Sequence, residues 1–533
     1  MSGHVTVSGL AYAHPGGDLL FSDVSFTIRA GGKVGVVGAN GVGKTTLFRV
    51  IAGELRADEG AVSVTGRLGF MAQDVGVGRA AAATVREMLT SYAPQTLREA
   101  GQRMIAADAA LAGGDDAAGM DLGTAIGDWA AHGGYELEAA WDRACRRIVR
   151  ASFADLAERS PASLSGGERK ALVLDVLFAS DADVLLLDEP DNFLDVPGKQ
   201  ALERQIASSP KTVLVISHDR ELLAAASRSV LTLEGNGSWM HDGSYATYPE
   251  AREARQRKLG DAVKRWKDEE RRLRELVRTF KERARYAPEW ARKADAMESR
   301  WRRFADPGPP PAPVVDQQIR VRMRGGDSAR RVLALHDIAV DGVLEPFSDE
   351  VHFGERVGII GPNGGGKTHL ISVLAGERDP DGGRVVVGPR VSPGYFTQLN
   401  VRDDLGGRPL IDVVQERTGQ LERAMNALAR YGLADAARRT SETLSGGQKA
   451  RLEILLLELE GHNLLLLDEP TDNLDIDSSE ALEQALEGFE GTVVAVSHDR
   501  AFLRSMDRFV FVPHTGAVTA IPDHRAALEV LSA

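Results

Sequence analysis

The sequence has a single cysteine and no long apolar segment. One cysteine, Cys145, excludes an intramolecular disulfide and any metal cluster built on several cysteines. No apolar run approaches the roughly 18 residues that a membrane-spanning helix requires, so we expect no membrane association. The first residues, MSGHVTVSGL, have neither the basic start nor the apolar core of a secretory signal. These absences predict a cytoplasmic protein, and 533 residues are enough for two or three domains.

The chain also lacks an overall positive charge, but its basic residues are unevenly distributed. The formal net charge is −13. Residues 251–306 contain 19 Lys and Arg against 11 Asp and Glu, a balance of +8, so the remainder carries −21. The total argues against a nucleic-acid partner. A basic island within an acidic body nevertheless indicates a local phosphate-binding surface.

Two stretches of the sequence are nearly the same. GKVGVVGANGVGKTTLF at residues 32–48 and ERVGIIGPNGGGKTHLI at residues 355–371 each predict a β-strand, a glycine loop and the start of a helix. Both fit the pattern G-x-x-x-x-G-K-S/T. In this pattern backbone N–H groups surround phosphates, the lysine reaches the β- and γ-phosphates and the hydroxyl binds Mg²⁺. One match is weak evidence, but two matches after apolar strands predict two sites for ATP and Mg²⁺. The expected ATP-binding residues are Gly38, Asn40, Gly41, Gly43, Lys44, Thr45 and Thr46 in the first copy and Gly361, Asn363, Gly364, Gly366, Lys367, Thr368 and His369 in the second.

Each copy then has two acids at the end of an apolar strand. VLLLDEP places Asp188 and Glu189, and LLLLDEP places Asp468 and Glu469, at the carboxyl ends of strands buried on both faces. Ligands of α/β sheets bind at this edge. We expect the first acid to bind Mg²⁺, and the second to orient and deprotonate the water that attacks the γ-phosphate.

Two further positions recur in the same order. The strands in TVLVISHDR and TVVAVSHDR end at His218 and His498, which we expect to sense the γ-phosphate in catalysis. Gln73 and Gln398 follow LGFMA and PGYFT, and are expected to bridge Mg²⁺ to the attacking water. The expected Mg²⁺ ligands are Thr45, Gln73 and Asp188 in one site and Thr368, Gln398 and Asp468 in the other.

A third motif resembles the signature of ATP-binding-cassette (ABC) ATPases. It is LSGGE at residues 164–168 and LSGGQ at residues 444–448. A serine hydroxyl and glycine N–H groups at a helix start form an anion site. The resemblance implies that the signature of one cassette completes the ATP site of the other. One chain with two cassettes would then form its own head-to-tail sandwich as a monomer. The implied residues are Ser165, Gly166 and Gly167 in the second site and Ser445, Gly446 and Gly447 in the first.

The segment between the cassettes has the pattern of a helical hairpin. Apolar residues recur at alternating spacings of four and three over residues 259–280, where Glu270 fills the one gap, and again over residues 290–304. This is the spacing of a coiled-coil seam. We therefore expect Trp266, Trp290 and Trp301 to pack in the seam rather than to stack on RNA bases. A first arm of about 26 residues would extend about 40 Å.

The basic residues of the hairpin lie outside this seam. Because they cluster toward the tip of an otherwise acidic protein, we expect them to bind RNA phosphates; a solvated charged face is the alternative. They are Arg271, Arg272, Arg274, Arg278, Lys281, Arg283, Arg285, Arg292, Lys293, Arg300, Arg302 and Arg303. The proline-rich segment 307–313 is expected to form a stiff return strap.

The basic hairpin and an insertion of about 45 residues in the first cassette resemble the ABC-F family of translation factors. The resemblance implies an α/β fold with two P-loop ATP-binding-cassette domains joined by an α-helical coiled-coil hairpin. It also implies an ATPase that binds the ribosome at the tRNA exit site, contacts rRNA and tRNA phosphates through the linker, and modulates translation or protects the ribosome from antibiotics. ATP hydrolysis would release it. The iron–sulfur and zinc-binding branches of the superfamily require more cysteines than one. The alternative is the ATPase subunit of an ABC transporter with separate permeases.

The expected domains are residues 1–250, with a helical arm at about 90–135, a linker at 251–328 and a second cassette at 329–533.

The family usually has T-N-H-L-D after the catalytic glutamate, whereas this chain has DNFLD at residues 191–195 and TDNLD at residues 471–475. Tyr12 is the expected adenine-stacking residue of the first site, and the second offers only Val340. We therefore expect the second site to bind ATP more weakly.

Overall fold

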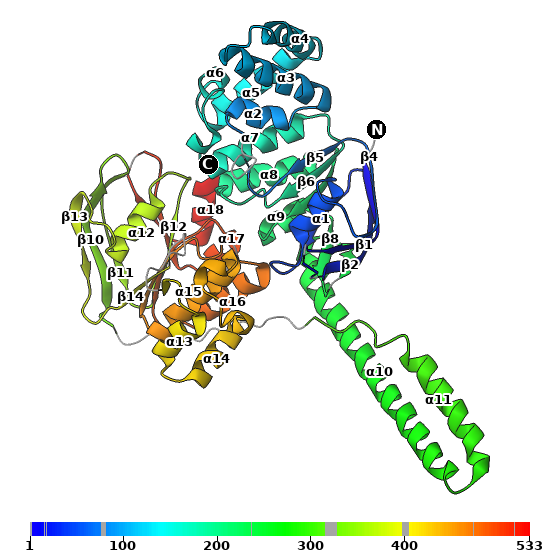
Figure 1. The fold of residues 1–533 in the computed structure, drawn as a ribbon. Helices are drawn as coiled ribbons and strands as arrows, with labels where there is room; N and C mark the ends of the chain where they lie inside the picture. Colours follow the sequence, from blue (N-terminus) through cyan, green and yellow to red (C-terminus); the bar gives the residue numbers. More distant parts are fainter. Residues whose placement is uncertain are drawn as a thin grey trace.

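The computed structural model describes residues 3–14, 16–17, 19–75, 82–235, 237–314, 328–396, 405–472, 474–515 and 517–532. Two α/β cassettes lie against each other, and a long helical hairpin projects from the first of them (Figure 1). Gln398 and Asn473 lie outside the described residues. Within the described part of the chain, no helix combines the length and the apolar character needed to cross a membrane.

The first cassette is built on two sheets. The central sheet has the strand order β5–β6–β7–β3–β8–β9 and is parallel except for β9. Its strands β3, β6 and β7 are buried along their whole length because their apolar runs are covered on both faces. An antiparallel sheet, β2–β1–β4, packs beside it. The bounds are β1 His4–Ala13, β2 Leu19–Ile28, β3 Lys33–Val37, β4 Glu59–Thr65, β5 Leu68–Met71, β6 Val184–Asp188, β7 Thr212–Ile216, β8 Ser229–Glu234 and β9 Gly237–His241.

Helices cover this sheet and form an arm at one end of the cassette (Figure 1). In the arm, α3 and α4 pair across a turn that contains Gly113 and Gly114, and α5 continues back toward the cassette. Trp129 and Trp141 fill its interior, with ring centroids 6.0 Å apart. The helices are α1 Lys44–Ile51, α2 Val85–Ser91, α3 Gln95–Ala112, α4 Ala118–Ala131, α5 Gly134–Ile148, α6 Phe153–Leu156, α7 Gly166–Ala179, α8 Val196–Ser208 and α9 Arg220–Ala226.

The second cassette repeats the architecture without the arm. Its central sheet has the order β14–β15–β16–β12–β17–β18, and its antiparallel sheet the order β11–β10–β13. The strands are β10 Arg331–Val340, β11 Leu344–His352, β12 Arg356–Ile360, β13 Gly382–Val387, β14 Pro393–Phe396, β15 Leu464–Asp468, β16 Thr492–Val496, β17 Arg508–Phe511 and β18 Thr519–Ile521. The helices are α12 Lys367–Ala375, α13 Leu410–Thr418, α14 Leu421–Arg430, α15 Gly446–Glu460, α16 Ile476–Glu487, α17 Arg500–Leu503 and α18 His524–Ser532.

The hairpin consists of α10 (Tyr248–Ala284) and α11 (Ala291–Ala305). The expected packing of its tryptophans is confirmed. Trp266 stacks on Phe304 and Trp290 on Phe280, each pair with ring centroids 5.7 Å apart. The indole of Trp301 donates a hydrogen bond to the carboxylate of Glu270 (3.1 Å), so this seam glutamate has a partner on the opposite helix.

The expected length of the first arm was wrong. α10 has 37 residues rather than about 26, because it begins at Tyr248, inside the first cassette. Tyr248 stacks on Trp239 of β9 (5.7 Å between ring centroids) and Pro249 lies in the first turn, where a proline is tolerated. At 1.5 Å per residue the helix is about 55 Å long.

The two cassettes exchange residues reciprocally. Val196, the first residue of α8, belongs to the hydrophobic core of the second cassette, whereas Ile476, the first residue of α16, packs against the core of the first. Ion pairs repeat the exchange: Arg220 contacts Glu483, and Arg500 contacts Glu203. The cassettes therefore meet through equivalent surfaces in a head-to-tail arrangement.

Candidate nucleotide sites

Both glycine loops follow a buried strand of the central sheet and lead into a helix. Gly38 and Gly361 have a φ of 151°, and a Cβ at either would collide with the backbone carbonyl of Leu233 or Val512. Glycine is therefore required where the loop leaves the strand. The Lys44 ammonium lies inside its own loop and donates to the carbonyls of Gly38 (2.7 Å) and Ala39 (3.2 Å).

The lysine of the second loop is held in the same way. The Lys367 ammonium donates to the carbonyls of Gly361 (3.0 Å) and Pro362 (2.9 Å). Burial lowers the pKa of both Lys44 and Lys367, and the acids beside them partly offset the effect. Each glycine loop therefore holds one buried cation, and a bound anion would stabilise it.

Each glycine loop faces the signature motif of the other cassette. The first loop and the second signature enclose a cavity of about 370 Å³, and the second loop and the first signature one of about 390 Å³. The predicted residues that line the first cavity are Asn40, Gly41, Gly43, Lys44, Thr45, Thr46, Gln73, Glu189, His218, Ser445, Gly446 and Gly447. Those that line the second are Ser165, Gly166, Gly167, Asn363, Gly364, Gly366, Lys367, Thr368, His369, Glu469 and His498.

The serine of each signature begins its helix with a capping box. The Ser165 hydroxyl accepts from the N–H of Glu168 (3.2 Å), and the Ser445 hydroxyl from the N–H of Gln448 (3.3 Å). In return, the serine N–H donates a hydrogen bond to the side-chain oxygen of Glu168 or Gln448. The box orients the serine and the first helical N–H groups toward the opposite cassette.

The two glutamates have the same unusual backbone. Glu189 has a φ of 48° and Glu469 a φ of 49°, which lie in the left-handed region that residues other than glycine rarely adopt. Each stays attached to the next strand, since the Glu189 N–H donates to the carbonyl of Ile216 and the Glu469 N–H to that of Val496. Strain of this kind is typical of functional sites.

Among the described residues, the side-chain partners of these glutamates differ. Glu189 accepts hydrogen bonds from the amides of Gln73 and Asn192, both at 2.7 Å, and lies 3.7 Å from the imidazole of His218. Glu469 accepts from the backbone N–H of His498 at 3.0 Å and lies 3.6 Å from its imidazole. Both sites therefore place a histidine beside the glutamate, but side-chain amides orient only the first one among the described residues.

Burial determines the protonation of these groups. It raises the pKa of both Glu189 and Glu469, and neighbouring acids add to the effect. It lowers the pKa of His218 to about 3, with a further contribution from Lys44, and lowers the pKa of His498 well below its usual value. Both histidines are therefore neutral near pH 7 and can donate one hydrogen bond each. A carboxyl with a raised pKa is suited to accept a proton from water.

The acids that precede the glutamates fit a divalent cation. Both carboxylate oxygens of Asp188 are buried without a hydrogen-bond partner among the described residues. In the second cassette the Thr368 hydroxyl lies 3.5 Å from the Asp468 carboxylate. Among the described residues no group of three His, Cys, Asp or Glu side chains could hold a metal alone. A Mg²⁺ ion would therefore be shared between Thr45 and Asp188, or Thr368 and Asp468, and the phosphates of the nucleotide.

Some predicted residues lie outside the cavity walls. Tyr12 is not among the lining residues of the first cavity; its ring packs edge-on against His14 (5.9 Å between centroids), and His14 and Leu20 line the cavity instead. Val340 is buried, and Val343 lines the second cavity. Sequence reasoning missed these positions because His14 and Val343 lie in turns between strands, where spacing gives little indication of direction, and Leu20 lies at the start of β2, next to such a turn.

The difference in lining residues predicts unequal ATP affinity. A Lys44→Ala chain binds ATP only in the second site, and a Lys367→Ala chain only in the first. We expect the first variant to bind about fivefold more weakly, because between its first two strands the first cassette contributes the ring of His14 to the cavity and the second contributes Val343, and an aromatic contact is worth roughly 1 kcal/mol. Titration with a fluorescent ATP analogue measures both constants. Equal affinities in the two variants would contradict the prediction.

Comparisons with known proteins agree with this geometry. The family model for the ABC transporter domain matches residues 21–192 and 344–472, more than half of the chain. The chain is 42% identical to an antibiotic resistance protein of Mycobacteroides abscessus, over 97% of this chain and 98% of that protein. It is 33% identical to the tylosin resistance ATP-binding protein TlrC of Streptomyces fradiae, over 90% and 92% of the two chains.

Two further similarities concern translation-related proteins. The chain is 31% identical to the energy-dependent translational throttle protein EttA of Mycobacterium tuberculosis, over 93% of this chain and 89% of that protein. Its fold is similar to that of an archaeal ribosome recycling factor, with a TM-score of 0.61 at 18% identity over 98% and 92% of the chains. With its two cassettes, its helical hairpin and these relatives, the chain is an ATPase that belongs to the ABC-F family.

Proposed function

We propose that this protein binds the ribosome in its ATP-bound state and modulates translation or protects the ribosome from an antibiotic. The observation that carries the proposal is the hairpin: residues 251–306 have a balance of +8 on a chain of −13, and they project from the cassettes as two long helices (Figure 1). A positively charged hairpin on an otherwise acidic protein fits a partner that is rich in phosphate groups. The names of the relatives, which concern antibiotic resistance and a translational throttle, support it.

The exposed charges of the hairpin support an RNA partner in more detail. Several of its basic residues are neutralised within the hairpin, as where Lys281 and Arg302 both contact Glu298. Eight exposed arginines of the hairpin have no acidic partner among the described residues, and they are Arg265, Arg274, Arg278, Arg283, Arg285, Arg292, Arg300 and Arg303. Tyr286 at the tip is 91% exposed, which is unusual for an aromatic ring and offers a surface for stacking on a base.

The proposed cycle uses the two composite cavities. ATP and Mg²⁺ bind to the glycine loops, with Thr45, Gln73 and Asp188 or Thr368, Gln398 and Asp468 on the metal. Each signature serine then closes on the γ-phosphate held by the other cassette. The closed chain, a cytoplasmic monomer, occupies the tRNA exit site, where the hairpin contacts rRNA and tRNA phosphates. Glu189 and Glu469 activate water, assisted by His218 and His498, and hydrolysis opens the sandwich and releases the protein.

Co-sedimentation with purified bacterial ribosomes tests this proposal. We expect the chain to pellet with ribosomes in the presence of a non-hydrolysable ATP analogue and to remain in the supernatant with ADP. The alternative function, an ATPase subunit of a transporter, predicts instead that the chain co-purifies with membrane vesicles. A chain that stays free of ribosomes with saturating analogue would contradict the proposal.

A further inference from the structure

The two cassettes differ at two positions that follow the catalytic-type glutamates. Two residues after the glutamate, the first cassette has Asp191 and the second Thr471; ten residues after it, they have Lys199 and Ser479. A lysine and an aspartate thus occur together in one cassette, where the other has two small hydroxyl residues. Both Asp191 and Lys199 are buried. A buried pair of opposite charges on one side only indicates a role that the two sites do not share.

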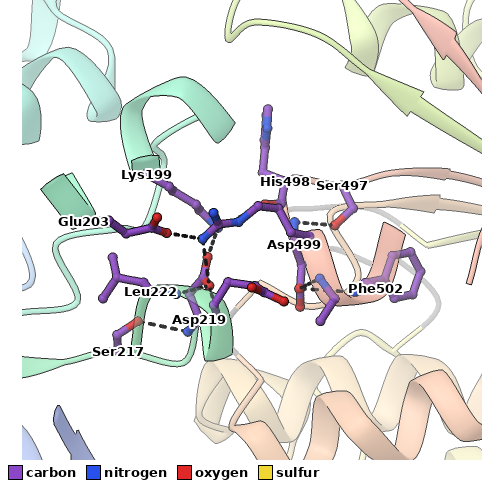
Figure 2. Close-up of polar contacts among 12 residues, drawn as sticks. Lys199, Glu203, Ser217, Asp219, Leu222, Ser497, His498, Asp499 and Phe502 are labelled. Atoms are coloured by element: carbon purple, nitrogen blue, oxygen red, sulfur yellow. Dashed lines mark hydrogen bonds and ion pairs between the residues drawn. The ribbon is translucent and has the colours of Figure 1, made fainter. Parts of the chain in front are cut away.

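Lys199 lies between the two histidine-bearing loops (Figure 2). Its ammonium is 3.0 Å from the carboxylate of Asp219, the residue after His218, and donates to the backbone carbonyl of His498 at 3.2 Å. Its side chain lines both cavities. A single cation from the first cassette therefore contacts the sensor loop of each nucleotide site.

Asp219 is fixed independently of Lys199. Its carboxylate accepts from the N–H groups of Glu221 and Leu222 (both 3.0 Å) at the start of α9, and Arg500 of the second cassette approaches it at 3.5 Å. Lys199 is therefore attached to a rigid anchor in its own cassette, while its bond to His498 crosses the interface. Only the closed sandwich can supply that carbonyl.

The contact continues to the glutamate of the second site. The His498 N–H donates to the Glu469 carboxylate at 3.0 Å, and the imidazole lies 3.6 Å from the same carboxylate. Lys199 thus contacts the residue that orients Glu469. The equivalent aspartate, Asp499, accepts only from the N–H groups of Ala501 (2.9 Å) and Phe502 (3.3 Å) among the contacts of the described residues. No lysine faces it from α16, where Ser479 occupies the equivalent position.

We infer that Lys199 is a positioning residue that makes hydrolysis at the second site depend on closure of the first cassette against it. When the cassettes close, the ammonium holds the His498 carbonyl and thereby orients the histidine and Glu469. Among the described residues no cation contacts the carbonyl of His218 in the way that Lys199 contacts that of His498, and the glutamate of the first site is oriented by the amides of Gln73 and Asn192. The two sites would therefore hydrolyse ATP under different control. The inference rests on the proposed catalytic role of the two glutamates.

A matched pair of variants separates positioning from folding. Lys199→Met leaves Asp191 buried without its cation and leaves Asp219 with Arg500 alone, so it is expected to lower the melting temperature as well as kcat. The double variant Asp191→Thr with Lys199→Ser gives the first cassette the residues of the second and removes one charge of each sign. We expect it to regain much of the lost melting temperature, while kcat stays about tenfold below that of the unchanged chain and KM for ATP changes less than twofold.

The direction of the effect is measured in single-site chains. In a Glu189→Gln chain hydrolysis comes from the second site, and we expect the double variant to lower it about tenfold. In a Glu469→Gln chain hydrolysis comes from the first site, and we expect a clearly smaller decrease. Recovery of kcat together with the melting temperature would overturn the inference, as would equal decreases in the two chains. If neither glutamine substitution alone lowers hydrolysis, the glutamate assignment fails, and the kcat of the double variant in the unchanged chain still decides the role of Lys199.

Discussion

Replacing Glu189 and Glu469 together with glutamine is expected to reduce ATP hydrolysis by about 10²–10⁴-fold, the usual contribution of a general base. Glutamine has the shape of glutamate and keeps an oxygen that can accept from Gln73 or from the His498 N–H, so the closed geometry is retained. It cannot accept the proton of water. The ATP-bound, closed state therefore accumulates, and we expect the double variant to remain in the ribosome pellet with ATP, whereas the unchanged chain is released.

A chain that cannot bind the phosphates is the control for this experiment. Lys44→Ala with Lys367→Ala removes both ammonium groups from the glycine loops, so this variant should neither hydrolyse ATP nor be retained on ribosomes. If the glutamine variant sediments free of ribosomes with ATP, the proposed link between closure and ribosome binding is wrong. If it is retained equally without nucleotide, the hairpin binds independently of closure.

The second large effect concerns the cations of the hairpin. Replacing Arg278, Arg285 and Arg292 with glutamine removes three exposed charges that have no acidic partner among the described residues. We expect the affinity for ribosomes to fall by about 10²-fold or more at physiological salt. The slope of log affinity against log salt should become shallower by about 2 to 3, because each phosphate contact that is lost reduces the number of counterions released on binding. Sedimentation over a series of salt concentrations measures both quantities.

A matched variant carries the same change of charge elsewhere. Arg49, Arg67 and Arg331 are exposed arginines on the cassettes, and each contacts an acid. Replacing these three with glutamine should leave the affinity and the salt slope nearly unchanged. ATP hydrolysis without ribosomes should be the same in both triple variants. Equal loss of affinity in the two would show that net charge, rather than the hairpin surface, determines binding.

Much of the fold could be predicted because its signals are local. The glycine loops, the strands that end in Asp188 and Asp468, and the two signatures each consist of a short pattern with a fixed chemical requirement. The seam of the hairpin was also readable from spacing, including the glutamate that meets Trp301. Such patterns determine local structure regardless of what packs around them.

What the sequence could not provide depends on contacts between distant segments. The start of α10 at Tyr248 depends on packing against Trp239, and the place of His14 at the first cavity depends on how β1 and β2 meet. Lys199 acquires its contact with His498 only when the cassettes face each other, since His498 is 299 residues away. A comparison of the two copies could have drawn attention to Lys199, because the first copy has an aspartate and a lysine at the positions where the second has a threonine and a serine.

The root of α10 lies at a junction of both halves of the molecule. Tyr248 stacks on Trp239, and Arg252 contacts Glu234 of the first cassette (3.3 Å) and Asp477 of the second (3.6 Å). A rod of about 55 Å that is clamped at one end acts as a lever. A rotation of about 5° at the clamp would displace the far end by about 5 Å, comparable to one helical turn. A small rotation between the cassettes would therefore move the tip of the hairpin far enough to make or break its contacts.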